Sequence, residues 1–400
     1  MTLFEKLTAY RDSDYYGFHM PGHKRNAALT GTDLPYGIDI TEIDGFDDLH
    51  HARGILKAAQ ERAARLYGAE ETCYLVNGST VGILSAILGC TDRGDKILVA
   101  RNCHKSVYHA VFMKELRAEY IYPQYLEEEE LNGEICVGDV RRILRENAKT
   151  DEEKEHIRAV VIVSPTYDGV VSDVRAIADA AHEYGIPLIV DEAHGAHFGF
   201  DSYFPQNANA CGADVVIHSL HKTLPSLTQT ALLHMNGDLA ERGEIRRYLH
   251  MLQSSSPSYV LMAGMDECMR LLETRKQELF GIYVKNLEQT REQLKQLNVL
   301  QLTETSHFDK SKLVISTKNT DKSGKWLYRE LLERYHLQME MAAGNYIIAM
   351  TSLADTQEGF ARLVAALREI DRRLETEWKK KEGGREEQCG EGSIPGCRPG

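Results

Sequence analysis

The feature of this sequence that most restricts its fold is a series of short apolar runs that alternate with amphipathic segments. Six such runs follow residue 70, at 72–76, 96–100, 159–164, 187–191, 213–219 and 231–235. Between most of them, apolar residues recur at the three- and four-residue spacing that is typical of helices. Strands that are apolar along their whole length are buried on both faces, so we expect a mostly parallel sheet with right-handed crossovers. The pattern predicts an α/β domain over about residues 55–260.

The rest of the chain divides into four further segments. Residues 1–54 form an N-terminal segment, and a long charged helical pattern over 261–300 indicates a connecting helix. Residues 301–380 contain further strand-like and helical patterns, which predict a smaller C-terminal α/β domain. The last twenty residues, 381–400, hold six glycines and two prolines with little apolar content, so we expect a disordered tail there.

Composition excludes several classes of partner. Lys and Arg total 47 against 60 Asp and Glu, and the net charge of −13 disfavours binding to a nucleic-acid backbone. No run approaches the roughly 20 apolar residues that a bilayer crossing needs, and the first sixteen residues lack the apolar core of a signal peptide. The eight cysteines form no CxxC pair, so we expect reduced thiols in a cytoplasmic protein that binds no membrane.

Polar residues that could bind a ligand or take part in catalysis follow four of the predicted strands, at the sheet edge where parallel sheets bind their ligands. The first group is Asn77 to Thr80, directly before a helical pattern. Gly78 permits a tight turn, and the free N–H groups of the helix start, with the Ser79 and Thr80 hydroxyl groups, would bind one phosphate. The same residues suit an ordinary helix cap. The GxxxxGK[ST] pattern of nucleotide-binding loops is absent from the sequence.

The second group contains His104, which follows the run at 96–100. Its imidazole ring would either stack on a heteroaromatic ring or cap the next helix. The third group begins with Asp191, a carboxylate at the end of a buried run that needs a cationic partner. The letters DEAH also occur in helicases, but those proteins need the missing phosphate loop. His194 and His197 are spaced for a metal, yet no further ligands with suitable spacing occur, so we expect no metal.

The fourth group contains Lys222, just after the run at 213–219. Such a lysine is usually a surface residue, but desolvation would lower its pKa, as a Schiff-base lysine requires. Together the four groups meet the needs of pyridoxal phosphate. The helix start anchors the phosphate, Asp191 keeps the pyridine nitrogen protonated, Lys222 joins the aldehyde, and His104 fixes the plane of the ring.

Eight motifs extend this interpretation to a family. They are FHMPGHK (18–24), TEIDGFDDLHHARG (41–54), VNGSTVG (76–82), RNCHKSVYHA (101–110), SPTYDGV (164–170), VDEAHGAHFGF (190–200), HSLHKTLPSLTQT (218–230) and MLQSSSPSY (251–259). In sequence and order they resemble the prokaryotic ornithine/lysine/arginine decarboxylases, which have the aspartate-aminotransferase-like fold, fold type I. The resemblance covers about residues 1–375.

The resemblance implies the following cofactor-binding and catalytic residues: Lys222 as the residue joined to the cofactor, Asp191 as partner of the pyridine nitrogen, His104 as the stacking ring, Gly78, Ser79, Thr80, Ser219 and His221 around the phosphate, Ala193 beside the cofactor, and His194 near its ring oxygen or the reacting carbon. It also implies a homodimer, or a higher oligomer, with active sites at the subunit interface. Residues 1–54 would contribute to that site and to the dimer, and the partner would contribute residues around 256–259.

The implied reaction converts a basic amino acid, arginine, lysine or ornithine, into the corresponding amine and carbon dioxide. Compared with the family, the chain resembles a shorter form without the N-terminal wing domain and with a shortened C-terminus. Glu340 is our candidate for binding the distal cation of the substrate, with Asp44 and Asp47 as further candidates; a solvated glutamate is the alternative.

Two other functional classes fit the same motifs. One is a fold type I aminotransferase or aldolase; an aminotransferase would bind the substrate carboxylate with an arginine, and residues 337–352 contain none. The other is a truncated, non-catalytic relative. The motifs do not choose among arginine, lysine and ornithine, although the shorter family members favour arginine.

Overall fold

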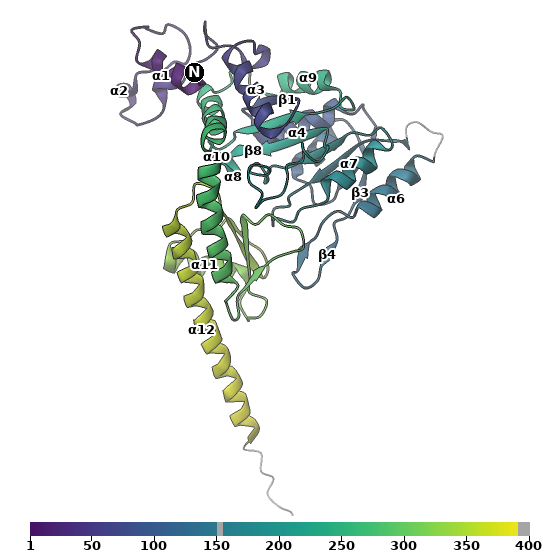
Figure 1. Cartoon of the computed structure of the whole chain (residues 1–400), viewed down its shortest axis with the longest axis vertical. Coiled ribbons are helices and arrows are strands. Elements are labelled where there is room, and N and C mark those ends of the chain that lie inside the picture. Colours follow the sequence, from purple (N-terminus) through teal and green to yellow (C-terminus); the bar gives the residue numbers. More distant parts are fainter. Residues whose placement is uncertain (150–154, 391–400) are drawn as a thin grey trace, which may run out of the picture. The chain divides into compact units, whose positions relative to one another are not determined.

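The computed structural model describes residues 1–149 and 155–390, and the chain divides into two compact units (Figure 1). The large unit consists of residues 1–282, 305–310 and 352–354. The small unit consists of residues 283–304, 311–351 and the chain from 355 onward. Helix α10 (Tyr259–Leu294) spans most of the expected connecting segment and contributes to both units.

A seven-stranded sheet forms the centre of the large unit, in the order β1-β9-β8-β7-β6-β2-β3. Its strands are β1 (Glu71–Leu75), β2 (Lys96–Ala100), β3 (Arg117–Ile121), β6 (Ile157–Val163), β7 (Leu188–Asp191), β8 (Val215–Ser219) and β9 (Ala231–Met235). Strand β9 pairs antiparallel with both β8 and β1, whereas the other neighbours pair in parallel. The prediction of a mostly parallel α/β sheet is therefore confirmed.

The sequence did not predict β3. Its charged residues, Arg117 and Glu119, alternate with uncharged ones, and most of the strand is exposed or half-buried, as suits a strand at the edge of a sheet. A short hairpin of β4 (Tyr125–Leu126) and β5 (Leu131–Asn132) follows it.

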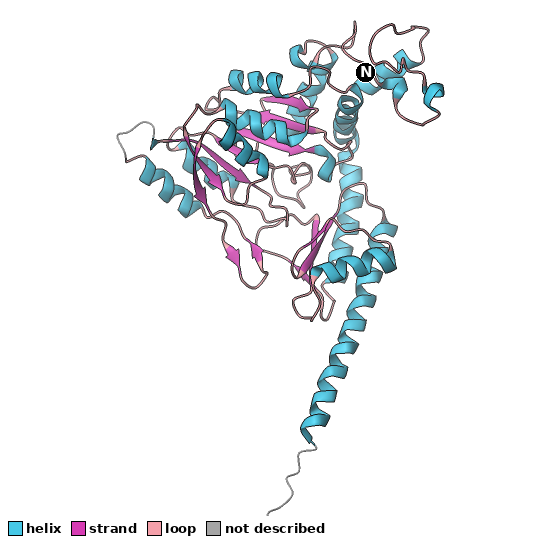
Figure 2. Cartoon of the chain, turned by 180° about the vertical axis from the view of Figure 1, so that it is seen from behind, coloured by secondary structure: helices cyan, strands magenta, loops and turns pink. Residues whose placement is uncertain are grey.

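Helices flank the large sheet on both sides (Figure 2). The other helices of the large unit are α1 (Leu3–Arg11), α2 (Ala27–Thr30), η1 (Tyr36–Ile38), η2 (Leu49–His51), α3 (Ile55–Tyr67), α4 (Gly78–Gly89), α5 (Lys105–Met113), α6 (Val137–Asn147), α7 (Val174–His182), α8 (Leu220–Thr223) and α9 (Arg242–Leu252). Helix α5 connects the parallel neighbours β2 and β3, and α7 connects β6 and β7, so the carboxyl ends of these strands meet at one edge.

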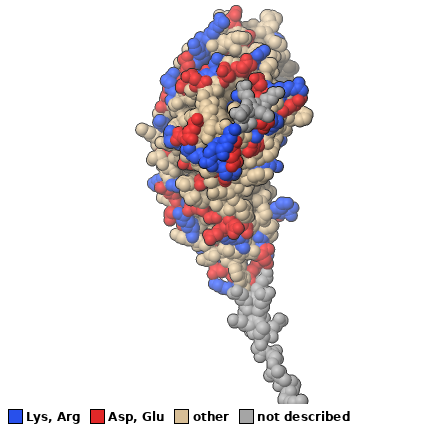
Figure 3. Space-filling model, turned by 90° about the vertical axis from the view of Figure 1, so that its right-hand side faces the viewer, with Lys and Arg blue, Asp and Glu red and all other residues tan. Residues whose placement is uncertain are grey.

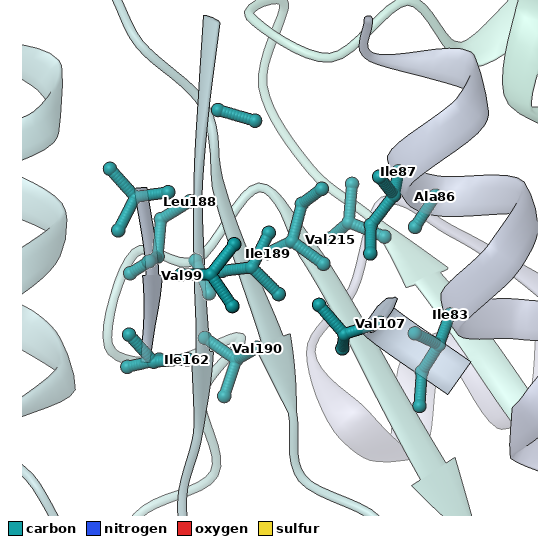
Figure 4. Close-up of a cluster of buried hydrophobic side chains, with 14 of the residues drawn as sticks. Ile83, Ala86, Ile87, Val99, Val107, Ile162, Leu188, Ile189, Val190 and Val215 are labelled. Carbon is teal, nitrogen blue, oxygen red and sulfur yellow. The ribbon is translucent and has the colours of Figure 1, made fainter. Parts of the chain in front are cut away.

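The core of the large unit lies between the sheet and these helices. Branched side chains of β2, β6, β7 and β8 belong to one buried cluster with side chains of α4 and α5 (Figure 4). The labelled members are Ile83, Ala86, Ile87, Val99, Val107, Ile162, Leu188, Ile189, Val190 and Val215. Burying each such side chain contributes about 1.5–3 kcal/mol. This packing holds the strand ends, and the polar residues that follow them, in fixed positions.

The small unit contains a four-stranded antiparallel sheet in the order β10-β11-β13-β12. Its strands are β10 (Gln301–Thr303), β11 (Lys312–Ser316), β12 (Met341–Ala342) and β13 (Tyr346–Met350), and its further helices are α11 (Gly324–Tyr335) and α12 (Gln357–Gly390). The expected smaller C-terminal α/β domain is therefore present in this part of the chain.

Helix α12 continues farther than we expected. It includes residues 381–390, the first half of the segment that we expected to be a disordered tail. Lys, Glu, Arg and Gln make up most of this stretch, and these residues have high helix propensity, whereas each glycine costs about 1 kcal/mol relative to alanine. Residues 391–400 lie outside the described residues.

Acidic and basic side chains are interspersed on the face shown in Figure 3, in keeping with an acidic protein that also forms many surface ion pairs. Within residues 1–149 and 155–390, no helix combines the length and the apolar content needed to cross a membrane.

Candidate active site

The carboxyl ends of four strands of the large sheet carry the residues that the sequence singled out. Asn77 and Gly78 follow β1, His104 follows β2, Asp191 ends β7, and Ser219 ends β8. Strands β2, β6, β7 and β8 pair in parallel, and β1 runs in the same direction, so these ends share one edge. The expected convergence of the four groups at this edge follows from the strand directions.

Lys222 lies in α8, a single helical turn that begins directly after β8. Its Nζ is 3.0 Å from Nε2 of His194, which lies in the loop after β7. The rings of Tyr167 and His194 meet in a T-shaped arrangement, with 4.8 Å between ring centroids. The lysine amine is therefore held beside an imidazole nitrogen that can accept its proton.

Asp191 is the last residue of β7 and is only 4% exposed. Its Oδ1 accepts a hydrogen bond from the N–H of Ala193 at 3.1 Å. Burial raises the pKa of Asp191 above its ordinary value, while the charge of Lys222, the Ala193 N–H and the charge of His104 act in the opposite direction. A buried carboxylate of this kind is stabilised by a further cation, such as a protonated ring nitrogen.

The start of α4 has the features of a phosphate site. Asn77 is the N-cap residue, and its side chain makes no capping hydrogen bond; its Oδ1 accepts instead from the N–H of Ser254 at 3.1 Å. Gly78 has φ +75°, a conformation that favours glycine. The helix start therefore keeps free N–H groups, next to the hydroxyl groups of Ser79 and Thr80, for an anion.

Ser219 supports the same interpretation. Its side chain is fully buried, and among the described residues its Oγ has no hydrogen-bond partner. A buried hydroxyl group without a partner costs about 1–3 kcal/mol, which a bound ligand oxygen would recover. The residues present thus fit a phosphorylated cofactor.

His104 and His221 make contacts within the protein. His104 is the N-cap residue of α5, where its Nδ1 accepts from the N–H of Ser106 at 3.3 Å and lies 2.8 Å from the Ser106 Oγ. Burial lowers the pKa of His104, which favours the uncharged form of its imidazole ring. The Nδ1 of His221 donates to the carbonyl of Thr230 at 3.0 Å. Capping thus fixes the orientation of the ring that we expected to stack on the cofactor.

Comparison with known proteins identifies the family. The model of the "Orn/Lys/Arg decarboxylase, major domain" matches residues 1–354. The chain belongs to the Orn/Lys/Arg decarboxylase family. It is 36% identical to the uncharacterized protein YaaO of Bacillus subtilis, over 93% of this chain and 78% of that protein. It is 31% identical to an arginine decarboxylase of Bacillus subtilis, over 93% of this chain and 77% of that protein.

Solved structures share the fold. The constitutive lysine decarboxylase of Escherichia coli superposes with a TM-score of 0.78 at 19% identity, over 92% of this chain. This chain spans 60% of the length of that protein. Serine palmitoyltransferase of Sphingomonas wittichii superposes with a TM-score of 0.64 at 16% identity, over 83% of this chain and 82% of that one. The fold is therefore that of fold type I, as predicted.

Members of the Orn/Lys/Arg decarboxylase family are carboxy-lyases that depend on pyridoxal phosphate and act on basic amino acids. Pyridoxal phosphate is accordingly the cofactor of this chain. The partnerless Ser219 hydroxyl group and the uncapped start of α4 suit its phosphate, and the buried Asp191 suits its pyridine nitrogen.

In this Orn/Lys/Arg decarboxylase, His194 and His197 turn to different partners. The Nε2 of His197 lies 3.0 Å from Oδ1 of Asp309, and both residues are buried. His194 contacts Lys222 instead. Among residues 1–149 and 155–390, no group of three or more potential ligands could hold a metal ion.

Asp47 and Tyr259 have roles within their own chain. The Asp47 carboxylate accepts hydrogen bonds from the N–H groups of Arg53 and Gly54 at 2.9 and 2.7 Å, near the start of α3. The Tyr259 hydroxyl group is buried and donates to the carbonyl of Asp47 at 2.6 Å. Asp47 therefore organises the loop before α3, and the buried Tyr259 hydroxyl group contacts this loop in its own chain.

Glu340 lies in the small unit, just before β12. Its N–H donates to the carbonyl of Ile348 at 2.9 Å, and the residue lines a cavity of about 510 Å³ with Asp355. Apolar residues complete the lining, among them Met339 and Phe360. The cavity combines acidic and apolar groups, as a cation on an aliphatic chain requires.

Sequence reasoning missed Tyr167 as a candidate. The residue follows the end of β6, the same position at which the other site residues follow their strands. Its motif, SPTYDGV, contributed to the family resemblance, but the contact of its ring with His194 depends on the pairing of β6 with β7.

Proposed function

We propose that this chain is an arginine decarboxylase that releases carbon dioxide and agmatine, with pyridoxal phosphate held at Lys222. The observation that carries the proposal is the contact between Lys222 Nζ and His194 Nε2 near the buried Asp191. Arginine as the substrate is supported by relatives. Arginine decarboxylases of Bacillus subtilis and Bacillus cereus align with 93% and 92% of this chain. Lysine decarboxylase LdcA of Pseudomonas aeruginosa aligns with only 68%.

The proposed cofactor-binding residues hold different parts of the cofactor. Lys222 binds the aldehyde carbon, and Asp191 binds the pyridine nitrogen. The start of α4, with Ser79, Thr80 and Ser219, binds the phosphate. We also assign Gly78 and His221 to the phosphate side, His104 to the face of the ring, and Ala193 to the neighbourhood of Asp191.

When bound, pyridoxal phosphate supplies an electron sink for the bond to the leaving carboxylate. The protein supplies a proton to the carbon that loses carbon dioxide. Lys222 Nζ and His194 Nε2 share one hydrogen bond, so either atom can hold that proton and pass it on. The ring of Tyr167 packs against the imidazole of His194 and orients that imidazole.

The distal cation of arginine needs an acidic partner, and we propose Glu340 for this role. Its support is the cavity that Glu340 and Asp355 line in the small unit. In Glu340→Gln the Michaelis constant for arginine should rise, because a neutral amide pairs more weakly with a guanidinium group than a carboxylate does. An unchanged constant for arginine, lysine and ornithine would remove Glu340 from the proposal.

We propose a homodimer, or a larger oligomer built from it, in which residues 1–54 meet the partner subunit. In the N-terminal segment, Tyr15, Tyr16 and Phe18 are 71%, 71% and 91% exposed, which is unusual for aromatic side chains on a protein surface. Analytical ultracentrifugation should report a dimer, and a chain with all three residues changed to serine should shift towards monomer.

We place the enzyme in the cytoplasm as part of the proposal. The six cysteines at 73, 90, 103, 136, 211 and 268 are free thiols, as is usual in a reducing compartment. Fractionation of cells that produce the protein should recover the activity with cytoplasmic markers.

The decisive experiment separates the proposed reaction from the other reactions of this fold. Purified protein with added pyridoxal phosphate is given arginine, lysine or ornithine, and both carbon dioxide and the organic product are measured. We expect carbon dioxide and agmatine from arginine. A keto acid would indicate an aminotransferase, and cofactor absorbance without any product would indicate a non-catalytic relative.

A further inference from the structure

A chain of four buried polar side chains runs behind Asp191 and takes no part in the proposed reaction. Oε2 of Glu192 lies 2.6 Å from Nε2 of His218. Nδ1 of His218 lies 2.9 Å from Nε2 of His234, and Nδ1 of His234 lies 2.7 Å from Oγ1 of Thr72. Glu192 is 2% exposed, and both histidines are fully buried.

This chain is built into the pairing of neighbouring strands. Asp191 pairs with Ile217 of β8, and the N–H of Glu192 donates to the carbonyl of Ile217 at 3.0 Å. Successive residues of an extended chain point to opposite sides. The two carboxyl groups therefore leave the backbone in opposite directions, and only that of Glu192 reaches His218.

Hydrogen bonding alone allows two arrangements of protons along the chain. In one, Glu192 is an anion that accepts from His218, and Thr72 donates into the chain. In the other, Glu192 is a neutral acid that donates to His218, each histidine donates onward, and Thr72 accepts. Both arrangements give every group a partner. Thr72, which is 5% exposed, is also among the residues that line a surface groove of about 530 Å³.

Burial and neighbouring charge distinguish the two arrangements. Burial lowers the pKa of His218 to about 3 and that of His234 well below its ordinary value, so neither ring supplies a positive charge. Burial also raises the pKa of Glu192 well above its ordinary range, and the Asp191 carboxylate adds to this rise. Two adjacent buried carboxylates repel each other, which favours a proton on one of them.

Two groups, the N–H of Ala208 and His197, lower the pKa of Glu192, but the effect of burial is larger. The N–H of Ala208 donates to both carboxyl oxygens, at 3.0 and 3.2 Å. The Tyr67 ring stacks on His218, but its hydroxyl group donates to the carbonyl of Ala196 at 2.7 Å. His197 lowers the pKa of Glu192, but its Nε2 already contacts Asp309.

We propose that Glu192 is a positioning residue that remains a neutral acid, so that Asp191, and not Glu192, carries the negative charge at this strand end. Its carboxyl group donates to His218 and accepts from Ala208, which holds the ends of β7 and β8 together. The consequence for catalysis rests on the proposed function, because it assumes that Asp191 faces the pyridine nitrogen of the cofactor.

Infrared spectroscopy of the cofactor-free protein tests the protonation directly. At neutral pH the wild-type protein should show the carbonyl stretch of a protonated carboxylic acid, and this band should move when glutamate is labelled with carbon-13. The band should vanish in Glu192→Gln and persist in Glu61→Gln, a control whose side chain is 57% exposed. A wild-type spectrum without the band, or a band that persists in Glu192→Gln, would overturn the proposal.

The holoenzyme tests the consequence for the site. Glutamine keeps a donor for His218 and an acceptor for Ala208, so Glu192→Gln should bind pyridoxal phosphate within about twofold of wild type. Asp191→Asn removes the proposed anion and should weaken that binding by about tenfold or more. A loss in Glu192→Gln as large as that in Asp191→Asn would mean that Glu192 supplies charge, which contradicts the proposal.

The two tests also separate this inference from the proposed function. If the infrared band is present but Asp191→Asn binds the cofactor normally, Glu192 is a neutral acid as inferred, and the role of Asp191 in the proposed function is wrong.

Discussion

Nζ of Lys222 lies 3.0 Å from Nε2 of His194, although the two residues follow different strands and are separated by 27 others in the chain. The parallel pairing of β7 with β8 produces this contact, because it aligns Asp191 with Ile217 and brings the loops after both strands together. An amine and an imidazole in direct contact can exchange a proton without a water molecule between them.

The first prediction concerns Lys222. Lys222→Ala should reduce carbon dioxide release from arginine to background, because no amine remains to hold the cofactor aldehyde. The absorbance of the bound cofactor should change as well. Lys105→Ala, at the exposed start of α5, is the matched control and should keep the wild-type rate. Substantial activity in Lys222→Ala would contradict the assignment.

The second prediction concerns His194. His194→Gln should lower the turnover number by about 100-fold, the usual cost of losing one proton donor or acceptor. Cofactor binding should change little, because Lys222 and Asp191 remain. Stopped-flow measurement with arginine distinguishes a slow chemical step from weak substrate binding. If only the Michaelis constant changed, His194 would be a binding residue and not a proton donor.

The third prediction concerns Ser219, whose replacement should affect stability differently in the cofactor-free and the cofactor-bound protein. In Ser219→Ala the cofactor-free protein should be as stable as wild type or slightly more stable, because a buried hydroxyl group without a partner is removed. Pyridoxal phosphate should bind about 10- to 100-fold more weakly, since a hydrogen bond to a charged phosphate oxygen is lost. Thermal unfolding with and without cofactor measures both effects, and equal shifts in both states would argue against a phosphate contact.

The buried pair of His197 and Asp309 should matter for stability. Asp309→Ala leaves the His197 imidazole without its carboxylate partner, and we expect a loss of about 1–3 kcal/mol in the free energy of unfolding. Asp309→Asn retains an oxygen that can accept from His197 and should recover most of this loss. Urea unfolding of both variants provides the comparison, and equal stability of alanine and asparagine variants would exclude the hydrogen bond as the cause.

The burial of His234 should make the free energy of unfolding depend on pH. Burial lowers its pKa well below the ordinary 6.5, so below that pH the unfolded chain binds a proton that the folded protein does not. The stability provided by the neutral ring is therefore present above pH 6.5 and is lost as the pH falls. Between pH 6.5 and 5.5 the wild-type protein should lose about 1 kcal/mol more than His234→Gln. Urea unfolding at both pH values measures this difference, and parallel losses in the two proteins would rule out His234 as the source.

The sequence was sufficient to predict the large sheet and the residues at its edge. Continuous apolar runs such as 187–191 and 213–219 indicated buried parallel strands, and parallel strands collect their carboxyl ends at one edge. Asp191 and Lys222 could therefore be placed near each other without coordinates. Strand β3 was missed because Arg117 and Glu119 interrupt any apolar run at 117–121, and the place of this strand at the edge of the sheet accommodates these charges.

Other contacts could not be predicted because they depend on residues far apart in the chain. Asp309 reaches His197 across 112 positions, and His234 reaches Thr72 across 162. Local spacing contains no information on such pairs, since they depend on strand register and on the path of a loop. For the same reason, the sequence suggested Asp47 as a substrate ligand, whereas its carboxylate is occupied by the backbone at the start of α3.

The short segment 305–310 belongs to the large unit although the chain on both sides of it belongs to the small unit. It supplies Asp309 to His197, a bridge from Phe308 to Val170, and the carbonyl that accepts from the N–H of Val171. A protein shortened after Ile282 would lose all of these contacts together with the small unit. A version of the large unit that is meant to fold alone should therefore retain residues 305–310, because truncation after Ile282 removes the carboxylate that contacts His197.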